Sequence, residues 1–147
     1  MYNYDTYAYG YYDSDGYYYY TNIGSDIAGT GYDAATVNMG APWRMPSTAQ
    51  QQELINNCSR QWTQQNGVNG ILVTGPSGGQ IFLPAAGYRW SDELDNADRY
   101  GDYGSSSLYP YYDFYAYHLY FYSGYWYWNS YYYRSDGFSV RPVRVQN

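Results

Sequence analysis

Lysine is absent from this chain of 147 residues, and cysteine and histidine occur only once each. Because Cys58 has no second cysteine, the chain cannot form an internal disulfide, a CxxC redox motif or a thiolate zinc cluster. The single His118 likewise excludes a metal site built from several histidines. The chain has seven arginines and thirteen acidic residues, which gives a net charge of −6 at pH 7. So few cations do not form a stripe along a phosphate backbone, and we expect no nucleic-acid partner.

Long apolar runs are also missing from the sequence. None approaches the ~20 residues that a membrane-spanning helix needs, and the chain does not begin with the charged start and apolar stretch of a signal peptide. We therefore expect no membrane span. A chain of this length with 45% hydrophobic residues suits a single core. We expect one domain over residues 25–147, preceded by a tyrosine-rich segment over residues 1–24.

Tyrosine is the residue in excess, with 26 copies that fall mainly in two blocks. Ten lie within residues 1–20 and thirteen between Tyr103 and Tyr133. The first block also contains Gly, Asp and Ser. It is consistent with a low-complexity segment that forms no core, and equally with a loop packed on the domain.

A helix is predicted over residues 48–59. Ser47 provides an N-cap, the first turn is polar, and Leu54, Ile55 and Cys58 form an apolar stripe at helical spacing. A cysteine on such a stripe is typical of a packed thiol, so we do not expect Cys58 to be a nucleophile.

Short antiparallel strands account for most of the remaining sequence. Residues 71–74 and 80–87 flank the turn GPSGG and predict a hairpin that buries Val73 and Phe82. The other segments are predicted to be a turn-rich connection at 61–70, a polar surface loop at 91–104, a hairpin turning at Ser123-Gly124 and a short closing strand at 137–145. One helix with several antiparallel strands gives an α+β fold.

Three stretches carry a resemblance to a known family: DIAGTGYDAATVNMGAPWRMPSTAQQQELINNC, WTQQNGVNGILVTGPSGGQIFLPAAGYRW and GFSVRPVR. Together they resemble the Fibrobacter succinogenes major paralogous domain family of Bacteroidetes, over about residues 25–144. More distantly, WRMPSTAQQQELI and GFSVRPV are similar to segments of formylglycine-generating-enzyme-like domains. Both families imply the C-type lectin fold. That fold also includes the variable proteins of diversity-generating retroelements, in which adenine-directed reverse transcription mutates the last segment.

The genetic code connects this resemblance to the second tyrosine block. Tyr, His, Asn and Asp share codons with adenine in the middle and a pyrimidine at the end, so changing the first base of an Asn codon generates all of them. The candidates for a diversified, ligand-binding surface are Tyr111, Tyr112, Asp113, Tyr115, Tyr117, His118, Tyr120, Tyr122, Tyr125, Tyr127, Asn129, Tyr131, Tyr132 and Tyr133. The residues between them are expected to be scaffold, namely Ala116, Leu119, Phe121, Gly124, Trp126 and Trp128, with Gly137, Phe138, Val140 and Val143 closing the core.

Tyrosine suits recognition because it offers a large contact area and a hydroxyl while freezing only two side-chain torsions. We therefore predict a non-enzymatic domain that binds a protein or glycan on another cell or virus, displayed on a bacterial surface or a phage virion. An exposed aromatic patch of this size also suggests a homo-oligomer. Two alternatives stay open. In the first, the domain binds a ligand but its surface is not diversified. In the second, the tyrosines stabilise sheets in a structural, fibre-forming protein.

No enzyme activity and no cofactor are expected. Nothing in the sequence places a serine and a carboxylate around His118, so we predict a solvent-facing strand residue there. The Glu-Pro-Asn and Trp-Asn-Asp motifs of calcium-dependent sugar-binding lectins are missing. One acidic loop is open to two interpretations, a structural cation site or a solvated surface. Its members are Asp92, Glu93, Asp95, Asp98 and Asp102.

Overall fold

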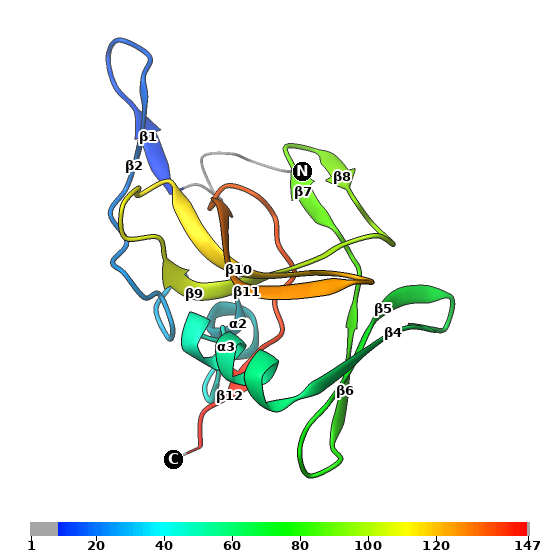
Figure 1. Cartoon of the computed structure of the whole chain (residues 1–147). Coiled ribbons are helices and arrows are strands. Elements are labelled where there is room, and N and C mark those ends of the chain that lie inside the picture. Colours follow the sequence, from blue (N-terminus) through cyan, green and yellow to red (C-terminus); the bar gives the residue numbers. More distant parts are fainter. Residues whose placement is uncertain (1–8, 147) are drawn as a thin grey trace.

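The computed structural model describes residues 9–146 and confirms an α+β fold of short antiparallel strands with two short helices (Figure 1). The helices are α2 (Ala34–Met39) and α3 (Thr48–Asn57). The strands are β1 (Gly10–Tyr12), β2 (Tyr18–Tyr20), β3 (Trp43–Arg44), β4 (Ser59–Gln65), β5 (Val68–Thr74), β6 (Gln80–Pro84), β7 (Tyr88–Trp90), β8 (Glu93–Asp95), β9 (Gly101–Leu108), β10 (Tyr115–Tyr122), β11 (Tyr125–Tyr133) and β12 (Val143–Arg144). Neither helix is long or apolar enough to cross a membrane.

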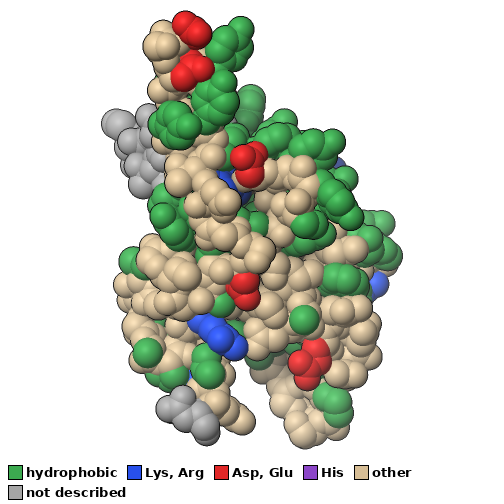
Figure 2. All heavy atoms as spheres, turned by 90° about the vertical axis from the view of Figure 1, so that its left-hand side faces the viewer, with side chains coloured by type: hydrophobic (Ala, Val, Ile, Leu, Met, Phe, Trp, Pro, Cys, Tyr) green, Lys and Arg blue, Asp and Glu red, His purple; other side chains and the backbone are tan. Residues whose placement is uncertain are grey.

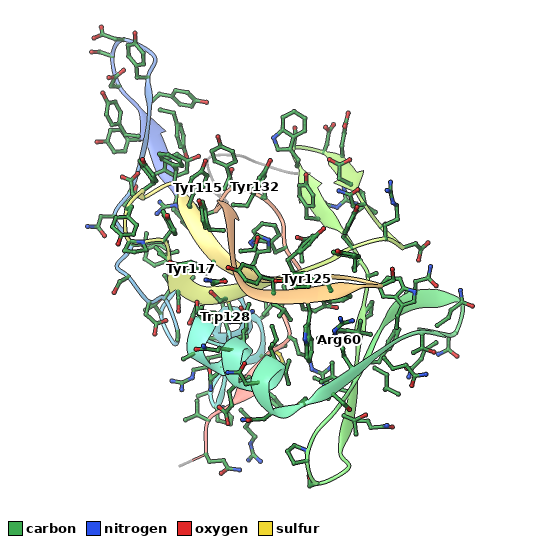
Figure 3. The ribbon with its side chains drawn as sticks, viewed as in Figure 1. Arg60, Tyr115, Tyr117, Tyr125, Trp128 and Tyr132 are labelled. Atoms are coloured by element: carbon green, nitrogen blue, oxygen red, sulfur yellow. The ribbon has the colours of Figure 1, made fainter. Side chains whose placement is uncertain are left out.

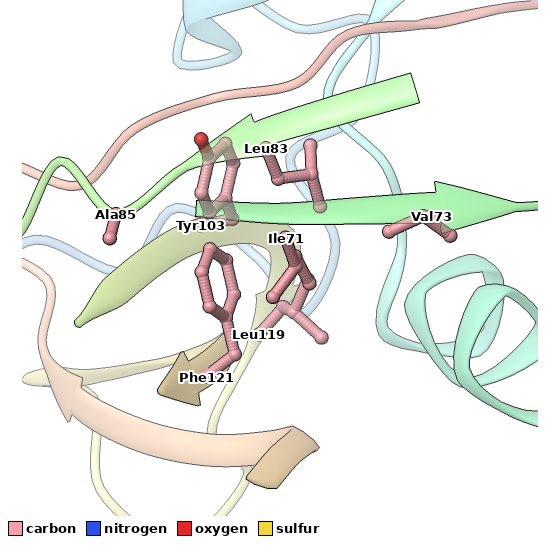
Figure 4. Packing of buried hydrophobic residues seen from close by; sticks show 7 residues of the cluster. All are labelled: Ile71, Val73, Leu83, Ala85, Tyr103, Leu119 and Phe121. Atoms are coloured by element: carbon pink, nitrogen blue, oxygen red, sulfur yellow. The ribbon is translucent and has the colours of Figure 1, made fainter. Parts of the chain in front are cut away.

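Two three-stranded sheets, β4-β5-β6 and β11-β10-β9, form the body of the domain. Their buried side chains meet in one core, which Figure 4 shows from close by. Ile71 of β5 and Leu83 of β6 face Leu119 and Phe121 of β10, and all four side chains are almost fully buried. Tyr103 of β9 stacks on the Phe121 ring at a centroid distance of 5.9 Å. The alternation of strand side chains places these residues on the inner faces of both sheets.

The hairpin predicted around GPSGG is confirmed as β5-β6. Val73 is buried as predicted, whereas Phe82 is only half-buried. Phe82 pairs with Leu72 on the face of β6 that points away from the core, because it alternates with the buried Leu83.

The predicted turn-rich connection at 61–70 is wrong, because β4 runs through it and pairs with β5 over its whole length. Only Asn66 and Gly67 form the turn, and both have positive φ, 51° and 82°. An Asn-Gly pair between two strands is the usual two-residue hairpin turn. The polar residues of β4 hid the strand, since β4 lies at a sheet edge and faces water on one side.

Helix α3 begins where the sequence predicts. Ser47 caps it, with its hydroxyl accepting from the Gln50 amide and the Gln50 side chain accepting from the Ser47 amide. The apolar stripe of Leu54, Ile55 and Cys58 packs against the core, which confirms that the Cys58 thiol is packed. The helix ends at Asn57, two residues earlier than predicted, and Cys58 is its C-cap.

A buried carboxylate, Asp33, organises the chain before α3. Its oxygens accept from the amides of Gly29, Ala35, Thr36 and Met45, at 2.8 to 3.1 Å, and from the Thr36 hydroxyl. Burial raises the pKa of this carboxyl, but the hydrogen bonds outweigh burial and hold the pKa below its usual value. Asp33 therefore caps α2 and ties the preceding loop to β3.

The predicted surface loop at 91–104 is also wrong in part, because it contains the largely exposed strand β8 and the first residues of β9. Gly101, Asp102 and Tyr103 belong to β9 and are buried. A Cβ atom on Gly101 would lie 2.1 Å from the Phe121 ring, so only glycine fits there. The Tyr103 hydroxyl donates to the Pro84 carbonyl at 2.9 Å. Polar and small residues hid this strand, because the Phe121 ring of β10 fills the space that a larger side chain at Gly101 would need.

The closing strand is shorter than the predicted 137–145. Only β12 pairs with β3, where Arg144 lies opposite Trp43. The residues before β12 form only isolated β-bridges, Gly137 with Arg89 and Ser139 with Tyr103.

The first tyrosine block contains a hairpin, β1-β2, that projects from the body (Figures 1 and 2). In Figure 2, side chains of the hydrophobic class, tyrosine included, lie beside acidic side chains on this hairpin and gather on the adjoining upper face. Arg134 holds its base by donating to the carbonyls of Tyr9 and Thr21 at 3.0 and 2.6 Å, and its guanidinium lies over the Tyr20 ring. The remainder of the tyrosine-rich segment predicted at 1–24 includes residues 1–8, which lie outside the described residues.

Candidate ligand-binding surface

The candidate surface is built on the β10-β11 hairpin, which turns at Ser123-Gly124 as predicted. Directly opposite residues share a face of the sheet. Tyr117 lies opposite Tyr131, and Tyr120 lies opposite Tyr127. Because side chains alternate along β10, these two pairs lie on opposite faces. The tyrosines of the second block are therefore divided between two surfaces and do not form one.

A β-bulge in β11 causes this division. His118 pairs with Ser130 and Tyr120 pairs with Tyr127, so Leu119 alone on β10 lies opposite both Trp128 and Asn129 on β11. The extra residue shifts the alternation by one. Tyr127 and Tyr131 would share a face in a regular strand, but the bulge places them on different faces. No glycine marks this bulge in the sequence, since its two residues are Trp128 and Asn129.

The first surface, the loop network, joins the β9–β10 loop to one end of the hairpin. Tyr109 is its centre, with its ring stacked on Tyr131 at 4.2 Å and in edge contact with Tyr117 at 5.4 Å. The members are Tyr109, Tyr111, Tyr112, Tyr115, Tyr117, Tyr131 and Tyr133, all connected through ring contacts. Figure 3 labels Tyr115 and Tyr117 on this side.

The second surface, the turn network, lies on the opposite face near the hairpin turn. Its ring contacts form a row from Tyr100 through Tyr120, Tyr122 and Tyr125 to Tyr127, with centroid distances of 5.5 to 6.2 Å. The hairpin under this row is fixed from the other sheet. Arg60 of β4 donates to the Gly124 carbonyl at 2.9 Å and lies over the Trp126 ring.

An open depression of about 560 Å³ lies at the β11 edge, beside the bulge. It brings Tyr127 of the turn network together with members of the loop network. Its lining residues are Tyr109, Tyr111, Tyr117, Tyr127, Asn129, Ser130 and Tyr131. Every one of them has a hydroxyl or an amide, so the depression combines aromatic area with hydrogen-bonding groups.

Most of the predicted surface residues are accessible. Nine are exposed: Tyr111, Tyr112, Asp113, Tyr122, Tyr125, Tyr127, Tyr131, Tyr132 and Tyr133. Four are half-buried: Tyr115, Tyr117, Tyr120 and Asn129. The expected scaffold residues Leu119 and Phe121 are buried, and Trp126 and Trp128 pack against the core, as predicted.

His118 contradicts the prediction of a solvent-facing residue, because its side chain is buried. Its Nε2 lies 3.3 Å from Asp102 Oδ1, and its ring stacks on Phe138 at 4.6 Å. The Phe138 ring covers the imidazole on this face of the sheet. His118 therefore belongs to the scaffold, although its codon fits the diversified pattern.

Two phenols of the surface, Tyr115 and Tyr120, have raised pKa values and keep their protons at neutral pH. The hydrogen bond to Tyr133, followed by burial, raises the pKa of Tyr115. Burial, followed by the charge of Tyr100, raises the pKa of Tyr120 to about 12. These hydroxyls therefore act as hydrogen-bond donors and acceptors, and do not act as bases.

Three tyrosines of the surface were not among the candidates, namely Tyr88, Tyr100 and Tyr109. Tyr109 lies two residues before the first candidate, and the same codon pattern includes it. Tyr88 and Tyr100 stand alone in stretches of ordinary composition, so only the folded chain reveals their ring contacts with Tyr132 and Tyr120.

No cluster of three or more potential metal ligands occurs in residues 9–146. The acidic stretch predicted as one loop is dispersed, since Asp102 turns inward to His118. Comparison with protein-family models, curated proteins and solved structures returned no match. The function of the chain is therefore inferred from the geometry of its surface and from the residue pattern of its sequence.

Proposed function

We propose that this chain is a non-enzymatic ligand-binding domain with a C-type-lectin-like fold. In this proposal the loop network and the turn network recognise a protein or glycan on a cell or virus surface. The domain acts outside the cell that makes it, on a bacterial surface or a phage virion. Its exposed tyrosines are varied by a diversity-generating retroelement, while the residues beneath them stay constant.

The observation that carries this proposal is the separation between surface and scaffold within one hairpin. Exposed Tyr125 and Tyr127 alternate with Trp126 and Trp128, which pack on the core. Substitutions at the exposed positions leave the core contacts in place. The exposed aromatic area also exceeds what packing requires, and such area on a folded domain is typical of an interaction site.

A fibre-forming role is the competing proposal, because β11 is a long edge strand rich in tyrosine. The bulge argues against it. A bulge interrupts the regular row of amides and carbonyls that edge-to-edge pairing needs. A fibre protein predicts regular filaments of the pure chain in electron micrographs, whereas a binding domain predicts none.

The depression at the β11 edge provides the sharpest test of binding. We expect the combined variant Tyr111→Ser, Tyr127→Ser and Tyr131→Ser to lose at least about tenfold in affinity, because a few aromatic anchors dominate most interfaces. The measurement applies labelled protein to an array of purified surface glycans and surface proteins of bacteria and phages, followed by titration of each array member bound.

The matched control changes three exposed tyrosines on the β1-β2 hairpin, Tyr11→Ser, Tyr17→Ser and Tyr19→Ser. This control should bind like the original chain. Equal loss in both triple variants would mean nonspecific adhesion of tyrosine and no defined site. Failure of the original chain to bind any array member would also count against the proposal.

A further inference from the structure

A second, smaller cavity of about 210 Å³ lies on the His118 side of the β9-β10-β11 sheet. It is distinct from the depression at the β11 edge and shares only Ser130 with it. Its aromatic lining consists of Tyr88, Tyr120, Tyr132 and Phe138, and its polar lining consists of Asp102, His118 and Ser130. Figure 3 labels Tyr132 at the far end of the hairpin.

The aromatic walls come from three separate parts of the chain. Tyr88 of β7 meets Tyr132 of β11 at a centroid distance of 6.0 Å and an interplanar angle of 63°. The same Tyr88 ring lies 6.2 Å from Phe138 in the closing segment. An aromatic ring that lines a cavity attracts a cation lying over its electron-rich face, through a cation–π interaction.

The polar side of the cavity offers hydrogen-bond acceptors. Asp102 and His118 are both more than nine-tenths buried. His118 Nε2 faces the Asp102 carboxylate, and His118 Nδ1 has no hydrogen-bond partner among residues 9–146. A neutral imidazole that donates from Nε2 carries a free lone pair on Nδ1. A buried acceptor without a partner is costly, which favours a ligand that brings donors.

Two carboxyl groups lie at the cavity, Asp102 in its lining and Asp136 buried next to Asp102. Burial, followed by Tyr132, Asp95, Asp136 and Asp102, raises the pKa of Tyr88. Within the described part of the chain, no arginine lines the cavity to balance these carboxylates. An anionic ligand would be repelled here, and an apolar ligand would leave the buried His118 Nδ1 unpaired.

We propose that this cavity binds the cationic head group of an arginine or lysine side chain presented by a protein partner. The Asp102 carboxylate pairs with the cation, and the rings of Tyr88, Tyr120 and Tyr132 surround it. The volume holds a guanidinium or ammonium group with part of its methylene chain. The site does not depend on the loop network, and a small cation tests it without any macromolecular ligand.

His118 is the only histidine in the sequence, so its ring C–H resonances report on the cavity without assignment ambiguity. The probes are the N-acetyl methylamides of arginine and lysine, with those of citrulline and norleucine as uncharged counterparts. We expect a saturable shift of the His118 resonances with arginine, lysine or both, at a Kd on the order of 1 mM. The uncharged probes should cause no saturable shift.

Neighbouring tyrosines provide matched variants, because Tyr131 and Tyr132 are both exposed and lie on opposite faces. Tyr132→Leu should weaken cation binding about threefold or more, and Tyr131→Leu should leave it unchanged. Asp102→Asn should weaken it about tenfold. The proposal is overturned if neither cation shifts the His118 resonances, if the uncharged probes shift them equally, or if Tyr131→Leu weakens binding as much as Tyr132→Leu.

Discussion

Replacing Phe121 with alanine should lower the free energy of unfolding by about 3 to 5 kcal/mol, the largest effect that we expect from a single substitution. Phe121 is 0% exposed, stacks on Tyr103 and fills the space that Gly101 leaves open. Removing its ring leaves a cavity between the two sheets, where neither can collapse without breaking strand pairing. Since single domains have only about 5 to 15 kcal/mol of stability, the variant should be near unfolding.

Two further variants, measured by urea denaturation, test whether stability depends on the buried Phe121 ring or on aromatic residues in general. Phe121→Leu keeps most of the volume and should cost less than about 1.5 kcal/mol. Tyr125→Ala removes an exposed ring of the turn network from the neighbouring strand and should cost about 0.5 kcal/mol or less. If Tyr125→Ala is as damaging as Phe121→Ala, the tyrosines are structural and the separation of surface from scaffold is wrong.

Replacing Asp136 with asparagine should stabilise the protein at pH 8 by on the order of 2 kcal/mol and leave it unchanged at pH 4. The Asp136 side chain is 6% exposed, and neither carboxyl oxygen has a hydrogen-bond partner among residues 9–146. Burial, followed by the charge of Asp102, raises the pKa of this carboxyl to about 7. The ionised form is therefore disfavoured in the folded chain, and asparagine removes the charge while keeping the shape.

The direction of the pH dependence follows from proton binding. Because the folded pKa lies above the unfolded value of 3.8, the folded chain holds the proton longer. The stability that this carboxyl contributes is complete below pH 3.8 and is lost as the pH rises to about 7. The difference between the two chains, measured by urea denaturation from pH 4 to 8, isolates this carboxyl. The exposed Asp15→Asn should show no such gain, and an Asp136→Asn chain less stable at pH 8 would mean that the carboxylate is paired.

Local patterns predicted the elements whose signals lie in neighbouring residues. The Ser47 cap, the apolar stripe of α3 and the turn at Ser123-Gly124 each depend on residues close in sequence, and the structure confirms them. Strands β4 and β9 were missed for a physical reason. Their residues are polar or small because their neighbours in space provide the apolar side chains, and sequence periodicity does not show those neighbours.

The candidate surface could be predicted by residue type but not by arrangement. Codon chemistry identified the exposed tyrosines of residues 111–133. It also selected His118 as a surface candidate, although His118 is buried and pairs with Asp102. The division into two networks depends on one bulged residue near Trp128, whose effect on every later side chain is not encoded in the residue types.

The central claim is a variable surface on a constant scaffold, and comparison of DNA sequences tests it most directly. The measurement is to sequence the genomic DNA beside this gene and search for a near-copy of the stretch that encodes residues 105–144, next to a reverse-transcriptase gene. We predict a copy that carries adenines at the positions where the two sequences differ. These differences should be confined to codons for exposed residues such as Tyr127 and Tyr131. The codons of His118, Leu119 and Phe121 should be identical in both. Absence of any copy, or adenine-linked differences at the buried codons, would contradict the claim.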